Sequence, residues 1–365
     1  MLDQLETLPQ DPRLVAIRFQ PEQLTRAREL RGLTKAALAA LVDKTPGAIS
    51  QFESGLTKPD SHTVARLGLA LAIPVSFFAR RVVGPSILSD ACHFRSLRSV
   101  SQSLRRQAIR IGEIGHEVLA LVQSDGVELP KDEISPLKCL PRSPEQIEQL
   151  AYDVRRRWGL GAGPIHEVLP LLESKGLRVL PLTAACAEVD AFSTWAEGEP
   201  IALLSFAKPS SRVHFDAAHE LGHLLMHDDV SPGNPVLEGD ADGFASAFLV
   251  PRESFLPECP SRWNLRDFQS LKARWRVSIQ ALVVRAHRLG KLSVASYRNA
   301  FIDLNRWGYR QAEPGEWDLM QPVVLRQALE LVSDDLPLSR IAKLLCLHEV
   351  QLRQVLGPLT PGEAA

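Results

Sequence analysis

The stretch 214-HFDAAHELGHLLMH-227 contains two histidines four positions apart, His219 and His223, with a glutamate directly after the first. On an α-helix, four residues rise about 6 Å and complete slightly more than one turn, so both imidazoles point the same way. Two imidazoles placed like this can bind one Zn²⁺ ion. Glu220 is displaced around the helix and is placed to take a proton from water at the metal. The H-E-x-x-H pattern therefore predicts a helical metal site with its own base.

A tetrahedral site needs a third protein ligand and leaves the fourth position to water. The segment 237-LEGDADGFASAFLVP-251 supplies the acidic candidates. We expect Glu238 to be the third ligand, with Asp240 as the competing choice. Asp242 follows one turn later and is placed to accept the free N–H of a ligand imidazole. His227 lies about 12 Å further along the helix than the first histidine, so all three histidines cannot bind one ion on a straight helix.

The composition indicates a globular chain of two or three domains, with 365 residues, 45% hydrophobic and 23% charged. No apolar run approaches the roughly 20 residues of a membrane span. The first residues are acidic and lack the apolar core of a signal peptide. The five cysteines are scattered without a C-x-x-C pair. We therefore expect a cytoplasmic protein with no membrane partner and no cysteine-ligated metal.

The charge is distributed unevenly along the chain, although the net charge is only −1. Residues 21–110 carry fourteen Arg and Lys against six Asp and Glu, a balance of +8. Residues 1–20 sum to −1, so residues 111–365 sum to −8. A basic N-terminal part is suited to a polyanionic partner.

Residues 21–78 have the pattern of short helices joined by tight turns. Gly32 ends the first helix, and Thr34 can cap the next one. Thr45 can cap a third helix with Pro46 at its first position, where a missing N–H costs nothing.

The motifs RGLTKAALA, TPGAISQFESG and the following KPD resemble the XRE, lambda-repressor-like family of helix-turn-helix proteins. The resemblance implies an all-α domain at residues 15–82 whose recognition helix enters the major groove of double-stranded DNA. It also implies a structural ion pair between Arg28 and Glu53. The residues expected at the DNA are Lys35, at a phosphate, and Thr45, Pro46, Gly47, Ala48, Ser50 and Gln51.

Only Ser50 and Gln51 of these offer hydrogen-bonding side chains for base edges. A homodimer is compatible with this interpretation, because helix-turn-helix proteins commonly bind two half-sites of DNA as dimers. The alternative is a helical module used for protein contacts alone.

Residues 90–127 predict a basic connecting helix. Its arginines either form a solvated face or add phosphate contacts beside the DNA-binding module. They are Arg95, Arg98, Arg105, Arg106 and Arg110. The proline-rich segment 128–146 marks the expected hinge.

Residues 143–258 predict an α+β domain in which a small sheet lies beside the histidine-bearing helix. Ser143 is the expected N-cap of its first helix. The runs 177–182, 190–200 and 201–206 read as strands. The last run is either a strand that pairs with a peptide substrate or a buried core strand.

Together, FDAAHELGHLLMH and EGDADGFASAFLVP resemble the ImmA/IrrE family of metallopeptidases over about residues 145–255. The resemblance implies a zincin fold, Zn²⁺ on His219, His223 and Glu238, and cleavage of helix-turn-helix repressors. The chain departs from the family in having Asp242 where asparagine is common, which keeps the hydrogen-bonding capacity.

Residues 263–358 predict a helical C-terminal region with helix-turn-helix-like segments at 263–293 and 337–357. Its arginines either meet DNA or are structural. They are Arg274, Arg276, Arg285 and Arg288.

The predicted fold class is mainly α with a small β-sheet: an N-terminal all-α lambda-repressor-like helix-turn-helix domain, an α+β zincin-like domain and a helical C-terminal region. The predicted function is that of a DNA-binding transcriptional regulator with a zinc-dependent peptidase, which cleaves a repressor-type protein in a stress or mobile-element response. Two alternatives remain. One is a regulator whose metallopeptidase-like domain is a non-catalytic sensor, and the other is an antitoxin-like regulator.

Overall fold

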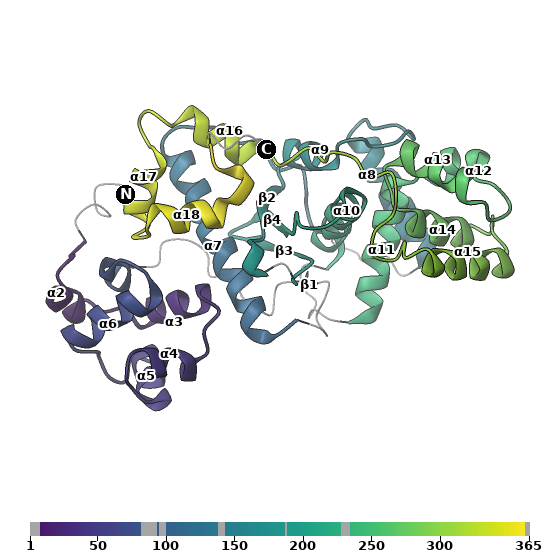
Figure 1. The fold of residues 1–365 in the computed structure, drawn as a ribbon. Coiled ribbons are helices and arrows are strands. Elements are labelled where there is room, and N and C mark those ends of the chain that lie inside the picture. Colours follow the sequence, from purple (N-terminus) through teal and green to yellow (C-terminus); the bar gives the residue numbers. More distant parts are fainter. Residues whose placement is uncertain are drawn as a thin grey trace.

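The predicted fold class is confirmed by a computed structural model, in which many short helices surround one small sheet (Figure 1). A helical N-terminal module lies at one end, the sheet lies in the middle, and a second group of helices lies at the other end. The structure describes residues 8–81, 93–94, 100–137, 143–186, 188–227 and 234–361. None of the helices in these ranges is long and apolar enough to cross a membrane.

The N-terminal module consists of short helices that bury one apolar face each. Thr34 and Thr45 cap two of them as predicted, because their hydroxyls accept the amides of Ala37 and Ala48, each at 3.1 Å. The elements are α2 (Pro12–Ile17), α3 (Pro21–Leu30), α4 (Lys35–Leu41), α5 (Pro46–Glu53), α6 (Ser61–Leu71) and η1 (Val75–Ala79).

The connecting helix is shorter than the sequence predicted. Helix α7 (Gln102–Ser124) begins after Ser101, whose hydroxyl accepts the Leu104 amide and so caps it. Residues His93–Phe94 form strand β1 instead of helix, because they pair with a neighbouring strand. The first two arginines of the predicted basic face, Arg95 and Arg98, lie outside the described residues.

The sheet has the strand order β1-β3-β4-β2. It contains β2 (Arg178–Pro181), β3 (Ala191–Ala196) and β4 (Glu199–Leu204) besides β1. Strand β3 is antiparallel to both β1 and β4, and β2 is parallel to β4. Of the two interpretations of the run 201–206, the buried core strand agrees with the structure, because β4 lies between β3 and β2.

The sheet separates two apolar cores. Successive side chains of a strand point to opposite faces, so Ile201 and Leu203 join one core while Ala202 and Leu204 join the other. The first core also contains the N-terminal module and α7. The second core contains α8 (Pro144–Arg157), α9 (Val168–Ser174), α10 (Ser210–Met226) and α11 (Pro235–Leu249).

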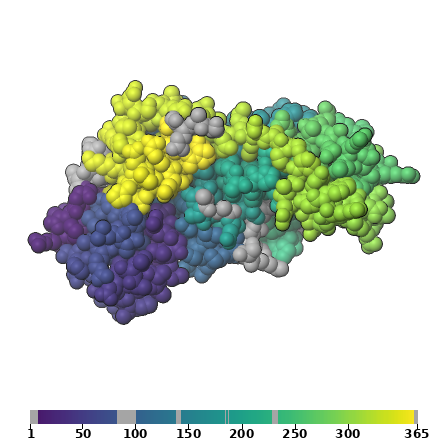
Figure 2. Space-filling model, viewed as in Figure 1, coloured from purple at the N-terminus to yellow at the C-terminus, as the bar shows by residue number. Residues whose placement is uncertain are grey.

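The C-terminal region is divided between these two cores. The helices α12 (Arg252–Glu258), α13 (Leu265–Trp275), α14 (Ile279–Arg288) and α15 (Val294–Arg306) extend the second core. The helices α16 (Val324–Leu331), α17 (Leu338–Leu344) and α18 (Glu349–Leu356) return to α7 and complete the first. Figure 2 shows these last helices packed directly on the N-terminal module. The helices of 263–358 therefore do not form the one continuous region that the sequence predicts.

Residues 307–323, which connect α15 to α16, tie two helix N-termini together through two carboxylates. Glu316 accepts the Ser211 amide at 2.8 Å at the start of α10, and Glu313 accepts the Ile279 amide at 2.6 Å at the start of α14. Lys272, which is 1% exposed, contacts both carboxylates. Negative charge at a helix N-terminus is favourable, so this connection fixes the helix that bears the histidines.

Glu173 on α9 caps the start of α16 in a similar way. Its carboxylate accepts the amides of Val323 at 2.7 Å and Val324 at 3.3 Å. Burial raises the pKa of Glu173 to about 7, although these amides and Arg178 act to lower it.

We predict that Glu173→Gln stabilises the protein more at pH 8 than at pH 5. The pKa of Glu173 in the folded state lies above its unfolded value of 4.5, so the stability of the parent is highest below that pH and is lost as pH rises to about 7. The gain in unfolding free energy should reach at most about 3 kcal/mol. The measurement is thermal and urea unfolding at both pH values. Exposed Glu330→Gln on α16 is the control, and a pH-independent difference would show that the assignment is wrong.

Candidate metal centre and DNA-facing surface

Three of the predicted metal-site residues converge at the middle of α10 and the start of α11. One ligand atom from each of His219, His223 and Glu238 lies within 4.8 Å of the other two. The two Nε2 atoms are 3.0 Å apart, and the Glu238 oxygens lie 3.4 Å and 3.5 Å from them. Two ligands about 2 Å from one tetrahedral ion would be about 3.3 Å apart. The spacing and the donor types therefore fit a Zn²⁺ ion.

The close approach of α11 to α10 depends on Gly222, between the two histidines. A Cβ atom added there would lie 3.1 Å from the Phe244 ring and 3.3 Å from the Ala241 Cα. Both contacts are tighter than ordinary van der Waals contact, and one of them is to backbone. A larger residue would push α11 away and carry Glu238 with it.

Each histidine has a partner on its other ring nitrogen. Asp242 lies 2.9 Å from His219 Nδ1, as the sequence predicted. His227 Nδ1 lies 2.9 Å from His223 Nδ1. If both Nε2 lone pairs face a metal, each Nδ1 must carry the ring proton. Asp242 and His227 are placed to accept hydrogen bonds from these two N–H groups.

The sequence analysis considers His227 only as a metal ligand and misses its contact with His223. It is 2% exposed and ends α10. The sequence could have predicted this contact, because His223 and His227 are four residues apart and so lie on one face of a helix.

Glu220 is buried and held by the sheet. Ser193 on β3 donates its hydroxyl to Glu220 Oε2 at 2.6 Å. This contact gives the proposed base a fixed orientation from a strand outside the H-E-x-x-H helix. No sequence pattern identifies Ser193, because its contact with Glu220 depends on how β3 packs against α10.

The competing ligand, Asp240, lies outside the cluster formed by the two histidines and Glu238. It lines a cavity on another face of α11, and burial raises its pKa. Burial also acts to raise the pKa of Glu238, but hydrogen bonds from His219 and His223 outweigh it and lower that pKa to about 2. Glu238 is therefore an anion at neutral pH, as a metal ligand should be.

The residues expected at DNA lie on and beside α5. Thr45, Pro46, Gly47 and Gln51 are exposed, while Ala48 and Ser50 are partly buried. Lys35 is exposed, but its ammonium contacts Ser50 Oγ at 3.1 Å and Glu53 at 3.4 Å. The expected scaffold pair is present, because Arg28 binds Glu53 with two hydrogen bonds of 2.5 Å and 3.1 Å.

The arginines of α7 divide into structural and exposed positions. Arg110 binds Glu29 at 2.9 Å and Glu113 at 2.6 Å, so it joins α7 to the N-terminal module. Arg106 is exposed and lies 3.8 Å from Glu29. Neither of the two predicted interpretations, a solvated face or phosphate contacts, describes Arg110.

The arginines of the C-terminal region are largely structural. Arg285 is buried and binds Glu148 at 2.5 Å and 2.7 Å. Arg274 binds Glu258, and Arg276 lies over the Trp317 ring at 5.0 Å. Arg288 is exposed and makes none of the ion pairs found among the described residues.

Comparison with protein families identifies two domains. Residues 24–78 match a helix-turn-helix family, and residues 172–287 match the IrrE N-terminal-like domain of the peptidase M78 family. None of the curated proteins matches the chain.

The chain is therefore a fusion of an XRE-type helix-turn-helix domain and an IrrE-like metallopeptidase domain. These matches support a DNA-binding regulator with a metallopeptidase-like domain. The second match extends through α13 into α14, consistent with their place in the second core.

We predict that His227→Phe weakens Zn²⁺ binding by about 10- to 100-fold, the typical effect of losing the hydrogen-bond partner of a ligand histidine. Phenylalanine fills the space of the ring and removes the acceptor for His223. The measurement is competition with a chromogenic zinc chelator, with His166→Phe, at an exposed histidine, as the control. Unchanged affinity would rule out the orienting role.

Proposed function

We propose that the protein is a DNA-binding regulator that hydrolyses a peptide bond in a repressor-type protein, with Zn²⁺ at His219, His223 and Glu238. The observation that carries the proposal is the convergence of these three ligands beside a separately held carboxylate. A domain that only sensed a metal would need the ligands, but it would not need Glu220 fixed next to them.

The residues of the site would have separate roles in the hydrolysis. When bound, Zn²⁺ supplies Lewis acidity that polarises a carbonyl and makes water easier to deprotonate. Glu220 accepts the proton of the attacking water and delivers it to the leaving amine. Ser193 donates to Glu220 Oε2 and so fixes the orientation of this carboxylate. Asp242 and His227 keep both imidazoles in the ligating tautomer.

The DNA-binding domain would bring this chemistry to an operator. We expect Gln51, which is exposed on α5, to read a base edge, and Lys35 to leave its contacts with Ser50 and Glu53 for a backbone phosphate. A helix-turn-helix repressor as the substrate is what the resemblance of the histidine-bearing segment to the ImmA/IrrE family implies. The net −8 of residues 111–365 also suits a basic substrate of this kind.

We predict that full-length protein binds duplex DNA with an affinity that falls steeply with salt, because phosphate contacts release counterions. Gln51→Ala should change the sequence preference, whereas Lys35→Ala should weaken binding to all sequences alike. A selection from random duplexes, followed by titration at 50 and 200 mM salt, measures both effects. Absence of binding at low salt would show that the protein is not a DNA-binding regulator.

We predict that Glu220→Gln folds, retains zinc and binds DNA like the parent, but loses cleavage and relief of repression. The amide keeps the shape of the side chain and cannot accept the proton, so the expected rate loss is at least about 10²–10⁴-fold. Regulatory output in cells is measured beside the zinc content and DNA affinity of the purified variant. Unaltered output with zinc bound would favour the sensor or the antitoxin-like alternative over a peptidase.

A further inference from the structure

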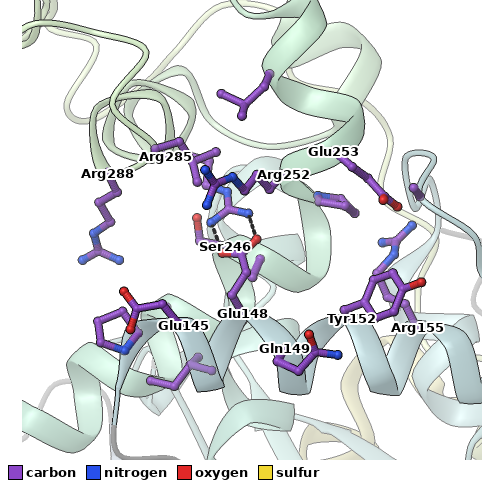
Figure 3. Close-up of a pocket in the computed structure, with 18 of the residues that line it drawn as sticks. Glu145, Glu148, Gln149, Tyr152, Arg155, Ser246, Arg252, Glu253, Arg285 and Arg288 are labelled. Atoms are coloured by element: carbon purple, nitrogen blue, oxygen red, sulfur yellow. Dashed lines mark hydrogen bonds and ion pairs between the residues drawn. The ribbon is translucent and has the colours of Figure 1, made fainter.

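A long groove lies beside the metal centre, on the outer side of α11. It has a volume of about 1180 Å³ and is bordered by α8, α11, α12 and α14. Figure 3 shows Arg288 and Glu145 at one end, Tyr152 and Glu253 at the other, and Ser246 between them. Pockets for small molecules usually measure about 300–1,000 Å³, so this groove exceeds the size that one such ligand needs.

A second cavity next to the groove reaches the partner of a candidate ligand histidine. A second cavity of about 400 Å³ is lined by Asp242, the partner of His219, and by Ser246 and Arg288. Ser246 and Arg288 also line the large groove. Ser246 lies one turn beyond Asp242 on α11, so the two cavities meet on this helix one turn away from the partner of His219.

The floor of the groove is open helix surface. A Cβ atom added at Gly239 would meet nothing within 4 Å, and one at Gly243 would meet only Ile147 Cγ2 at 3.6 Å. The Ser246 side chain makes no hydrogen bond to the described residues, although the residue is 7% exposed. A bound chain can therefore approach the α11 backbone closely and find a hydroxyl there.

The charges of the groove identify the class of ligand. Arg155 is bound to three backbone carbonyls, and Arg285 is paired with Glu148. The charged lining residues that form no ion pair with the described residues have both signs: Arg252, Arg288, Glu145, Asp240 and Glu253. Three carboxylates disfavour a nucleotide or a nucleic acid backbone, and five charges disfavour a lipid. A polypeptide with side chains of both signs fits them.

We infer that this groove binds an extended segment of the protein substrate, remote from the bond that is cleaved, with an acidic side chain of that segment at Arg288. The inference rests on the proposed peptidase function and extends it to substrate selection. Arg288 is the natural contact because it borders both cavities and its charge is not committed to the fold.

The test uses full-length, zinc-loaded protein and an equimolar synthetic library of dodecapeptides. Immobilised Glu220→Gln captures peptides without cleaving them, and mass spectrometry reads the captured set. We expect peptides with both acidic and basic residues to be enriched over uncharged ones. Arg288→Glu on the same background should reduce capture of peptides with acidic residues about tenfold and favour basic ones. Arg266→Glu makes the same charge reversal outside the groove, on exposed α13, and should leave the captured set unchanged.

A second variant, Gly243→Leu, fills the floor of the groove from a position where the added side chain meets little. It should reduce capture of all peptides while zinc content and unfolding midpoint stay as in the parent. Capture that is equal in the parent background, Arg288→Glu and Gly243→Leu overturns the inference, and so does an absence of capture.

Cleavage by protein with intact Glu220 separates this inference from the proposed function. If the parent and Arg288→Glu cleave the same library peptides, the result supports the peptidase function and overturns the inference that the groove binds the substrate. Capture that depends on Arg288, without cleavage by the parent, supports the groove and overturns the peptidase.

Discussion

The candidate metal centre depends on the contact between α10 and α11 at Gly222. The histidines of α10 face α11 through helical periodicity alone, but the third ligand must come from another helix. The missing Cβ of Gly222 lets the Ala241 backbone approach closely enough for Glu238 to reach both imidazoles. Three further contacts orient the side chains of the site. Asp242 and His227 contact the Nδ1 atoms of the two histidines, and Ser193 on the sheet contacts Glu220.

Helix α7 gives the two domains a fixed relation. Arg26 of the N-terminal module binds Glu113 at 3.0 Å and Glu117 at 2.9 Å, and all three side chains are buried. Arg80 contacts the same Glu117 and donates to the Leu345 carbonyl near the end of the chain. Removing one partner of a buried pair typically costs about 3–5 kcal/mol. These pairs therefore specify one orientation of the DNA-binding module on α7.

The sequence predicted what depends on local periodicity. H-E-x-x-H fixes the two histidines and Glu220 on one helix, and the caps at Thr34 and Thr45 define two helices of the N-terminal module. The sequence could not predict contacts that depend on how distant elements meet. Ser193 reaches Glu220 across 27 positions, and Arg80 reaches Leu345 across 265. The connecting helix was predicted too long because pairing between strands overrode the local helical pattern at His93–Phe94.

The shared sheet explains how one chain can combine both domains without a flexible joint at α7. Strand β4 buries alternate residues in each core. On α7, His116 lies 3.2 Å from Glu199 at the start of that strand. The same helix approaches β2 at Gly115, where a Cβ atom would lie 2.7 Å from Leu180. Since α7 also holds Arg26, the module that faces DNA and the strand next to Ser193 are fixed to one helix.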